Sequence, residues 1–496
     1  MNKKFVLSNL DTFIAAVAGF TLILILTQEY GVGISPDSIA YTGAARKLIT
    51  VHQLHNFNDS PFVDFPAFYP MFLATIMFIT KHDIIAIAPF INATLFASVI
   101  FLCGLIIDKF VLPSRWLKPL LLLLILISFP LLRIYYMLWS ETLFILLCFI
   151  FFIALHKYFF THTYRYLVIA ASIAAVTCVV RYAGITLIGT GLFLLMCDPK
   201  LRIGNKIRHM LVFGAVSATL LIANLFRNFL VTGTVTGERE KSITPLSDNI
   251  YYYGKVLVNW FSPLSSNYTL AFIITIISFI LLIVMFINNL LKLQRFYSYE
   301  NILIAYSLVY GGFIILSSTL SRYDQIDNRL LSPMFISLFL SIVSLIVAVT
   351  RKLNGKKIAS LICLLILMLF VKNQLQAFPT LSRIWSYNDV GWRTSSIMKF
   401  IKENKRIFKS NHTIYSNGSS VFYFYTGLKA EQVPNKNSSN EIEDFYKEDN
   451  IYVVWFNRDE TNEDLQLYNI EQNKHLTLIK KFDDGIIYVC DKAPSQ

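Results

Sequence analysis

The chain carries a long series of apolar segments, many of them rich in leucine, isoleucine and phenylalanine and free of charge. A helix needs roughly 20 such residues to cross about 30 Å of hydrocarbon, and helices satisfy their own backbone hydrogen bonds in lipid. Of the 496 residues, 55% are hydrophobic and only 15% are charged, which is too apolar for a soluble protein of two or three domains. The sequence therefore predicts a polytopic helical membrane protein.

Hydropathy predicts about eleven membrane spans. The first is longer than a signal-peptide core and lacks a small-residue cleavage site, so we expect it to be retained. The stretch 67–80 is expected to be a shallow or re-entrant helix on the outer face, because a crossing there would move the basic loops outside. The expected spans are residues 9–28, 84–107, 116–133, 138–155, 166–181, 183–197, 208–229, 268–290, 301–318, 331–349 and 358–372.

Lysine and arginine gather in the loops on the amino-terminal side of these spans, which is the positive-inside pattern. We therefore attribute the formal net charge of +13 to the basic loops that orient the protein in the membrane, and we expect no nucleic acid partner. The amino terminus is predicted to be cytoplasmic. Residues 29–83, residues 230–267 and the tail from about 373 are predicted to lie outside.

The tail differs in composition from the rest of the chain. It is polar, and its stretches "HTIYSN", "IYVVWF" and "GIIYVC" are typical of strands, while "VGWRTSSIMKFIKENKR" has helical periodicity. We expect residues 1–372 to form a transmembrane domain that includes the external loops 29–83 and 230–267. Residues 373–496 are expected to form a small external α/β domain.

Asp37 follows Ser35 and Pro36 in "ISPDSIAY". Ser35 suits a helix cap and Pro36 the first helical position, so Asp37 is expected in the first turn, where a carboxylate favours the positive end of the helix. The functional alternative is a general base, since a carboxylate on an external loop near the bilayer can take a proton from an attacking hydroxyl.

Other polar residues are predicted on the same membrane face, at span ends. A first-turn dipole role for Glu141 and snorkelling of Arg181 and Arg227 to lipid head groups are the structural alternatives. Several arginines at one face suit an anionic phosphate or pyrophosphate on a lipid, which arginine binds through two hydrogen bonds. The residues that we expect to bind substrate are Tyr69, Glu141, Arg181, Tyr182, Arg227, Asn228 and Arg329, with Arg322, Asp324 and Asp327 as weaker candidates.

The order and sidedness of several motifs resemble the GT-C superfamily of integral-membrane glycosyltransferases, in particular the bacterial group of protein mannosyltransferases, lipid A aminoarabinose transferases and rhizobial lipopolysaccharide glycosyltransferases. The motifs are "PDSIAY", "PAFYPMFLA", "SETLFILL", "RYAGITL", "RNFLVTGTVTG" and "RLLSPMFISLFL". The resemblance covers most of residues 1–350. Many relatives have an Asp-Glu pair in the first loop, whereas Ser38 follows Asp37 here.

The resemblance implies a bacterial inner-membrane enzyme. It implies a polyprenyl-phosphate-linked sugar as donor, and an envelope glycan, lipid or protein as acceptor on the outer face, with Asp37 as the base. No cofactor is assigned; a divalent metal is compatible and would need oxygen ligands such as Asp64 or Glu141 near Asp37.

Two other classes stay open. A secondary transporter would have ionisable residues near the bilayer midplane and interrupted helices in paired halves, which the sequence does not display. A noncatalytic, lipid-binding membrane scaffold with the same fold is harder to separate, because fold does not determine function. A polysaccharide polymerase or ligase is an alternative within the same class.

Overall fold

A computed structural model describes residues 9–112, 114, 116–237, 239, 241–261, 267–321, 325–352, 368, 370–374, 385–459 and 464–491. The chain divides into two compact units. The first comprises Met1–Gly31 and Val63–Ile384, and the second comprises Val32–Phe62 and Trp385–Gln496. The sequence division at residue 373 grouped Val32–Phe62 with the spans, whereas in the structure this segment belongs to the unit of the tail.

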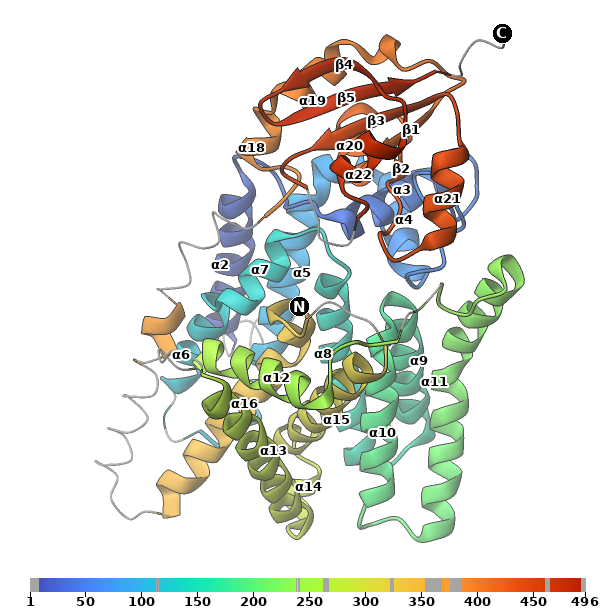
Figure 1. Cartoon of the computed structure of the whole chain (residues 1–496). Coiled ribbons are helices and arrows are strands. Elements are labelled where there is room, and N and C mark those ends of the chain that lie inside the picture. Colours follow the sequence, from blue (N-terminus) through green and yellow to red (C-terminus); the bar gives the residue numbers. More distant parts are fainter. Residues whose placement is uncertain are drawn as a thin grey trace. The chain divides into compact units, whose positions relative to one another are not determined.

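The first unit is helical, and its long helices pack along one another (Figure 1). Contacts join α2 to α5, α8 to α9, α9 to α11 and α15 to α16. Its helices are α2 (Leu10–Thr27), α4 (Phe68–Thr80), α5 (Ile84–Ile107), α6 (Leu117–Leu126), α7 (Phe129–Tyr136), α8 (Glu141–Thr161), α9 (Tyr164–Val180), the short 3-10 helix η1 (Tyr182–Gly184), α10 (Ile185–Cys197), α11 (Ile203–Thr232), α12 (Leu246–Phe261), α13 (Tyr268–Leu290), α14 (Leu293–Phe296), α15 (Tyr299–Leu320) and α16 (Asn328–Lys352).

The helical membrane architecture is confirmed, with a helix at ten of the eleven expected spans. In the described part of the chain, seven helices are long and apolar enough to cross a membrane, and α6 with α7, bent by 47°, would form an eighth. Helices α9 and α10 coincide with expected spans, but with 17 and 13 residues they are short for a membrane crossing, as is α4 with 13. The eleventh expected span, residues 358–372, lies mostly outside the described residues.

Helix α12 falls in the segment 230–267, which was expected to be an external loop. Tyr253, Leu257 and Trp260 are buried along it, and Gly254 lets it approach α13 closely: a Cβ added there would lie 1.9 Å from the carbonyl oxygen of Ala271. The hydropathy pattern missed α12 because a helix that buries only one face lacks a continuous apolar run.

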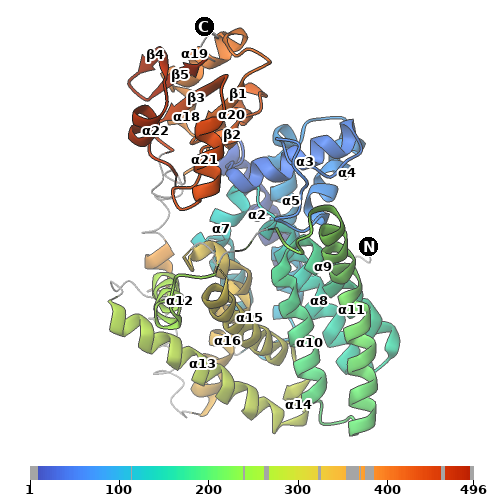
Figure 2. The same cartoon turned by 45° about the vertical axis from the view of Figure 1, so that its right-hand side comes forward.

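The second unit contains a five-stranded sheet with the strand order β2-β1-β3-β5-β4. Strand β1 is parallel to β2 and β3, whereas β5 is antiparallel to β3 and β4. All six residues of β3 are buried, and helices lie around the sheet (Figure 2). The elements are α3 (Pro36–Thr50), α18 (Val390–Arg393), α19 (Ser396–Glu403), η3 (Lys405–Ile407), β1 (Thr413–Ser416), α20 (Ser419–Thr426), β2 (Glu431–Gln432), α21 (Ser439–Lys447), β3 (Ile451–Phe456), α22 (Leu467–Asn473), β4 (Thr477–Phe482) and β5 (Gly485–Cys490).

Candidate functional site

Three helix ends of the first unit meet at Glu141. Glu141 is the first residue of α8, Arg181 follows the end of α9, and Arg329 is the second residue of α16. Arg181 Nη1 lies 2.6 Å from Glu141 Oε2, and Arg329 Nε lies 2.6 Å from Glu141 Oε1. The Glu141 side chain is fully buried, whereas each arginine side chain is 18% exposed. The structure thus brings together three residues that the sequence predicted to lie at span ends on one membrane face.

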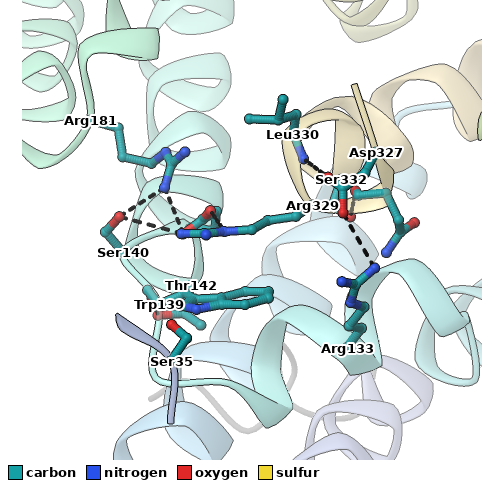
Figure 3. Close-up of polar contacts among 12 residues, drawn as sticks. Ser35, Arg133, Trp139, Ser140, Thr142, Arg181, Asp327, Arg329, Leu330 and Ser332 are labelled. Atoms are coloured by element: carbon teal, nitrogen blue, oxygen red, sulfur yellow. Dashed lines mark hydrogen bonds and ion pairs between the residues drawn. The ribbon is translucent and has the colours of Figure 1, made fainter. Parts of the chain in front are cut away.

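Neighbouring side chains hold the two guanidinium groups in place (Figure 3). Arg181 donates a hydrogen bond to Ser140 Oγ at 3.0 Å. The Arg329 guanidinium lies over the ring of Trp139, 4.1 Å from its centroid, which is a favourable cation–π arrangement. Two cations share one carboxylate, so this group of residues, which we call the Glu141 cluster, has a positive balance. Such a balance suits an anionic ligand.

The turn before α10 explains the position of Arg181. The backbone N–H of Gly184 donates to the carbonyl oxygen of Arg181 at 2.8 Å. A Cβ at Gly184 would lie 2.5 Å from the backbone nitrogen of Cys178, so only glycine allows this close return of the chain. The "RYAG" turn therefore fixes the backbone from which Arg181 reaches Glu141.

A cavity of about 530 Å³ lies beside residues 325–328, next to Arg329 in the sequence. Arg133 and Lys255 contribute cations to its wall, and Trp260 contributes an aromatic ring. Arg133 Nη1 lies 3.5 Å from Asp327 Oδ2 (Figure 3), and Asp327 Oδ1 also accepts from the backbone N–H of Leu330 at 3.1 Å. Asp327 thus caps α16 and pairs with Arg133. The cavity wall combines these charged groups with Lys255 and apolar side chains.

A second group of polar residues joins the end of α11 to the loops. The hydroxyl of Tyr182 accepts hydrogen bonds from Asn224 at 3.3 Å and Asn228 at 3.2 Å. Asn228 Nδ2 also donates to the carbonyl oxygen of Val63 at 3.3 Å, and Arg227 donates to Asn228 Oδ1 at 3.0 Å. Asn228 and Tyr182 therefore order the loops here, which is a positioning role.

Tyr69 belongs to the first unit and Asp37 to the second. Tyr69, in α4, is fully buried and packs against the ring of Phe72. Asp37 belongs to the second unit and occupies the first turn of α3, where the sequence placed it. The backbone N–H of Ser35 donates to Ser38 Oγ at 3.1 Å, so the residue after Asp37 serves the helix cap.

Two further expectations concern metal and loop residues. Among the described residues, no group of three His, Cys, Asp or Glu side chains is placed to hold a metal ion. Asp64 is in the first unit, and burial raises its pKa while the charge of Arg239 opposes that rise. Arg322 and Asp324 lie outside the described residues.

No family model and no curated protein matches the sequence, but solved structures match its fold. ArnT from Cupriavidus metallidurans bound to undecaprenyl phosphate gives a TM-score of 0.54 at 10% identity, over 99% of this chain and 98% of that chain. The oligosaccharyltransferase AglB from Archaeoglobus fulgidus, in complex with an inhibitory peptide and a dolichol-phosphate, gives 0.58 at 12% identity, over 92% of this chain and 69% of that chain. The chain has the GT-C fold. A GT-C fold is what the sequence motifs implied.

The sequence analysis missed several residues of this chain that line the cavity or order the loops near it. Arg133 and Lys255 line the cavity, and Asn224 Oδ1 accepts from the backbone N–H of Ala67 at 3.2 Å. The sequence contained a signal for Arg133, because a cation in the apolar run "SFPLLRIYY" has to be paired or solvated. It contained no such signal for Lys255, because α12 was not expected.

Proposed function

We propose that this chain is a glycosyltransferase that moves a sugar from a polyprenyl-phosphate or polyprenyl-diphosphate donor to an envelope acceptor on the outer face of the membrane. The observation that carries the proposal is the pair Arg181 and Arg329, held by the buried Glu141 at one end of an apolar helical bundle. Two solved structures with this fold were determined with undecaprenyl phosphate and with dolichol-phosphate, which supports a lipid-phosphate ligand.

In the proposed reaction, an acceptor hydroxyl attacks the anomeric carbon of the donor sugar. A new carbon–oxygen bond forms as the bond from that carbon to the phosphate oxygen breaks, through an oxocarbenium-like transition state. The proton of the acceptor goes to Asp37, and the electron pair leaves with the lipid phosphate. A base in this role contributes on the order of a hundredfold to ten-thousandfold in rate.

We assign the phosphate to Arg181 and Arg329. Their guanidinium groups stabilise the charge that builds on the leaving phosphate, and their attachment to Glu141 keeps them oriented before the substrate arrives. The cavity lined by Arg133, Lys255 and Trp260 is a second cationic surface for the same anionic head group. We assign to Arg227, which donates to Asn228, a role in ordering the loops rather than in binding the phosphate.

The experiment is transfer of label from a panel of polyprenyl-phosphate sugars to total cell-envelope acceptors. Membranes with wild-type protein are compared with membranes that hold equal amounts of Asp37→Asn or of Asp491→Asn, a surface control whose partners are His412 and Lys409. We expect transfer to vanish in Asp37→Asn and to persist in Asp491→Asn. Equal labelling in both variants would reject Asp37 as the base.

A lipid-binding scaffold predicts a different pattern in the same material. It would show no transfer with any donor in the panel, while undecaprenyl phosphate would still raise the melting temperature of the purified protein, because a ligand that binds only the folded state stabilises it. Transfer by the wild type, by contrast, would establish turnover and name the donor.

A further inference from the structure

A separate cavity of about 430 Å³, which we call the α14 cavity, lies where the end of α13, the start of α15 and the end of α16 come together around α14. Residues 109–112, which follow α5, also line it. Helix α14 lies at the lower end of the helical unit in both views (Figures 1 and 2). Segments that are far apart in the sequence therefore share this cavity.

The α14 cavity lies at the end of α16 that is opposite the Glu141 cluster. Arg329 is near the start of α16 and Leu345, which lines the cavity, is near its end, and the helix between them is about 24 Å long. His156 of α8 stacks on Tyr299 of α15, with 3.8 Å between ring centroids, so the basic end of α8 lies near the start of α15. The cavity is thus on the membrane side that the positive-inside pattern predicts to be cytoplasmic.

The wall of the α14 cavity contains two cations and several amides. Lys109 and Arg295 supply the positive charges, and Asn288 and Asn289 supply amide groups. Glu300 is the carboxylate of this wall, and it lies in the first turn of α15, where it favours the positive end of the helix. The wall therefore has a positive balance and hydrogen-bond donors, which suit a phosphate group.

Much of the remaining wall is apolar and leads onto the surface of α13. Phe110, Met285 and Ile304 are among the apolar residues that line the cavity. Leu281 and Ile277 follow Met285 on the same face of α13, nearer the middle of the helix, and they are 41% and 48% exposed. Because α13 is long and apolar enough to cross a membrane, this face offers a path for a hydrocarbon chain that begins at the cavity.

We propose that the α14 cavity binds an anionic phospholipid of the cytoplasmic leaflet, with its phosphate at Lys109 and Arg295 and an acyl chain along α13. Basic pockets between helices on the cytoplasmic side suit anionic lipid head groups. Lys109 follows α5 and Arg295 belongs to α14, so one bound phosphate would link two separate parts of the helical unit. This inference does not depend on the transfer reaction, and its test needs no sugar donor.

The experiment is native mass spectrometry of the purified full-length protein in detergent, with dioleoyl-phosphatidylglycerol or dioleoyl-phosphatidylcholine added. The measurement is the dissociation constant of the first bound lipid, and we expect the wild type to bind phosphatidylglycerol more tightly. Lys109→Gln/Arg295→Gln should weaken phosphatidylglycerol binding about thirtyfold, because each cation near an anionic head group contributes about fivefold. Both side chains are exposed, so the variant should fold.

Two further variants separate the cavity from the general charge of this membrane side. Lys157→Gln/Arg165→Gln removes the same charge from the end of α8 and the start of α9, and it should keep the wild-type affinity for phosphatidylglycerol. Ala348→Phe keeps both cations but places a ring at the cavity wall, and it should weaken phosphatidylglycerol binding as the loss of the two cations does.

Thermal unfolding identifies the source of the phosphate. Phosphatidylglycerol should raise the melting temperature of the wild type, because a ligand that binds only the folded state stabilises it, and inorganic phosphate should not. An equal rise with inorganic phosphate would make this a site for a soluble anion, and a rise with undecaprenyl phosphate alone would make it a site for the carrier lipid. Either result, or equal affinity of the wild type and Lys109→Gln/Arg295→Gln for phosphatidylglycerol, would overturn the inference.

Discussion

Glu141 has a guanidinium nitrogen 2.6 Å from each of its carboxylate oxygens. Glu141→Gln would remove the charge that both arginines share while keeping the size of the side chain. Since breaking a buried ion pair costs about 3–5 kcal/mol, we expect a clear fall in the melting temperature of the protein in detergent. The control is Glu443→Gln, which removes an exposed pair with Lys447 and should cost at most about 1 kcal/mol. Equal melting temperatures for the two variants would contradict this role of Glu141.

Arg329 makes two contacts that lysine cannot reproduce together. It donates through Nε to Glu141 and lies with its planar group over Trp139, whereas a lysine ammonium is a point charge without a planar face. We expect Arg329→Lys to lower the transfer rate on the order of a hundredfold, the cost of losing one preorganised donor, with a smaller loss of stability than Glu141→Gln.

Arg208→Lys serves as the control for Arg329→Lys. Arg208 lies over the ring of Tyr164 at 5.3 Å, near the start of α9, while Arg181 and the Glu141 cluster lie at the other end of that helix. The measurement is the initial rate of label transfer with saturating donor. A wild-type rate in Arg329→Lys would remove Arg329 from the proposed phosphate site.

At the scale of elements, the close packing of α12 against α13 allows us to predict an effect on stability that hydropathy alone does not indicate. Gly254 brings α12 against α13, and a Cβ there would overlap the carbonyl oxygen of Ala271. We expect Gly254→Ala to destabilise the protein by about 1–3 kcal/mol, as overpacking does, and to disturb Lys255 and Trp260 at the cavity. Gly312→Ala in α15 is matched to it, because nothing lies within 4 Å of the added Cβ. Thermal unfolding of both variants is the test, and equal stability would argue against this helix contact.

The same elements show what the sequence could predict and why. Long apolar runs predicted α2, α5, α8 and α13, since a span needs only length and hydrophobicity. The cap at Ser35 was predictable because it depends on three neighbouring residues. Helix α12 was missed because its buried face is decided by a partner helix. The pairing of Glu141 with Arg329 could not be predicted from the order of residues, because only the packing of α8 with α16 brings them together.

At the scale of the whole molecule, the second unit joins segments from opposite ends of the chain. Val32–Phe62 and Trp385–Gln496 form it together, through bonds such as that from Tyr387 to Ile34. Sequence patterns recognised β1, β3 and β5 of the tail but neither β2 nor β4, and they contain no signal for a partner segment so far away.

Orientation in the membrane is the property on which the proposed function depends most. Helix α8 runs from Glu141 to a basic end near Lys157, and α9 runs from near Arg165 back to Arg181. The basic ends therefore lie opposite the Glu141 cluster along these helices. By the positive-inside rule, we predict that the basic ends are cytoplasmic and that the Glu141 cluster and the tail are external.

Fusions of alkaline phosphatase and of green fluorescent protein after the last residue measure this orientation, because the phosphatase is active only outside and the fluorescent protein folds when it stays inside. We expect an active phosphatase and no fluorescence. A fusion within the loop that follows α8 should give the reverse result and so control for insertion. Fluorescence at the carboxyl terminus would place the tail in the cytoplasm, and it would exclude transfer to an acceptor on the outer face, because Asp37 belongs to the same unit as the tail.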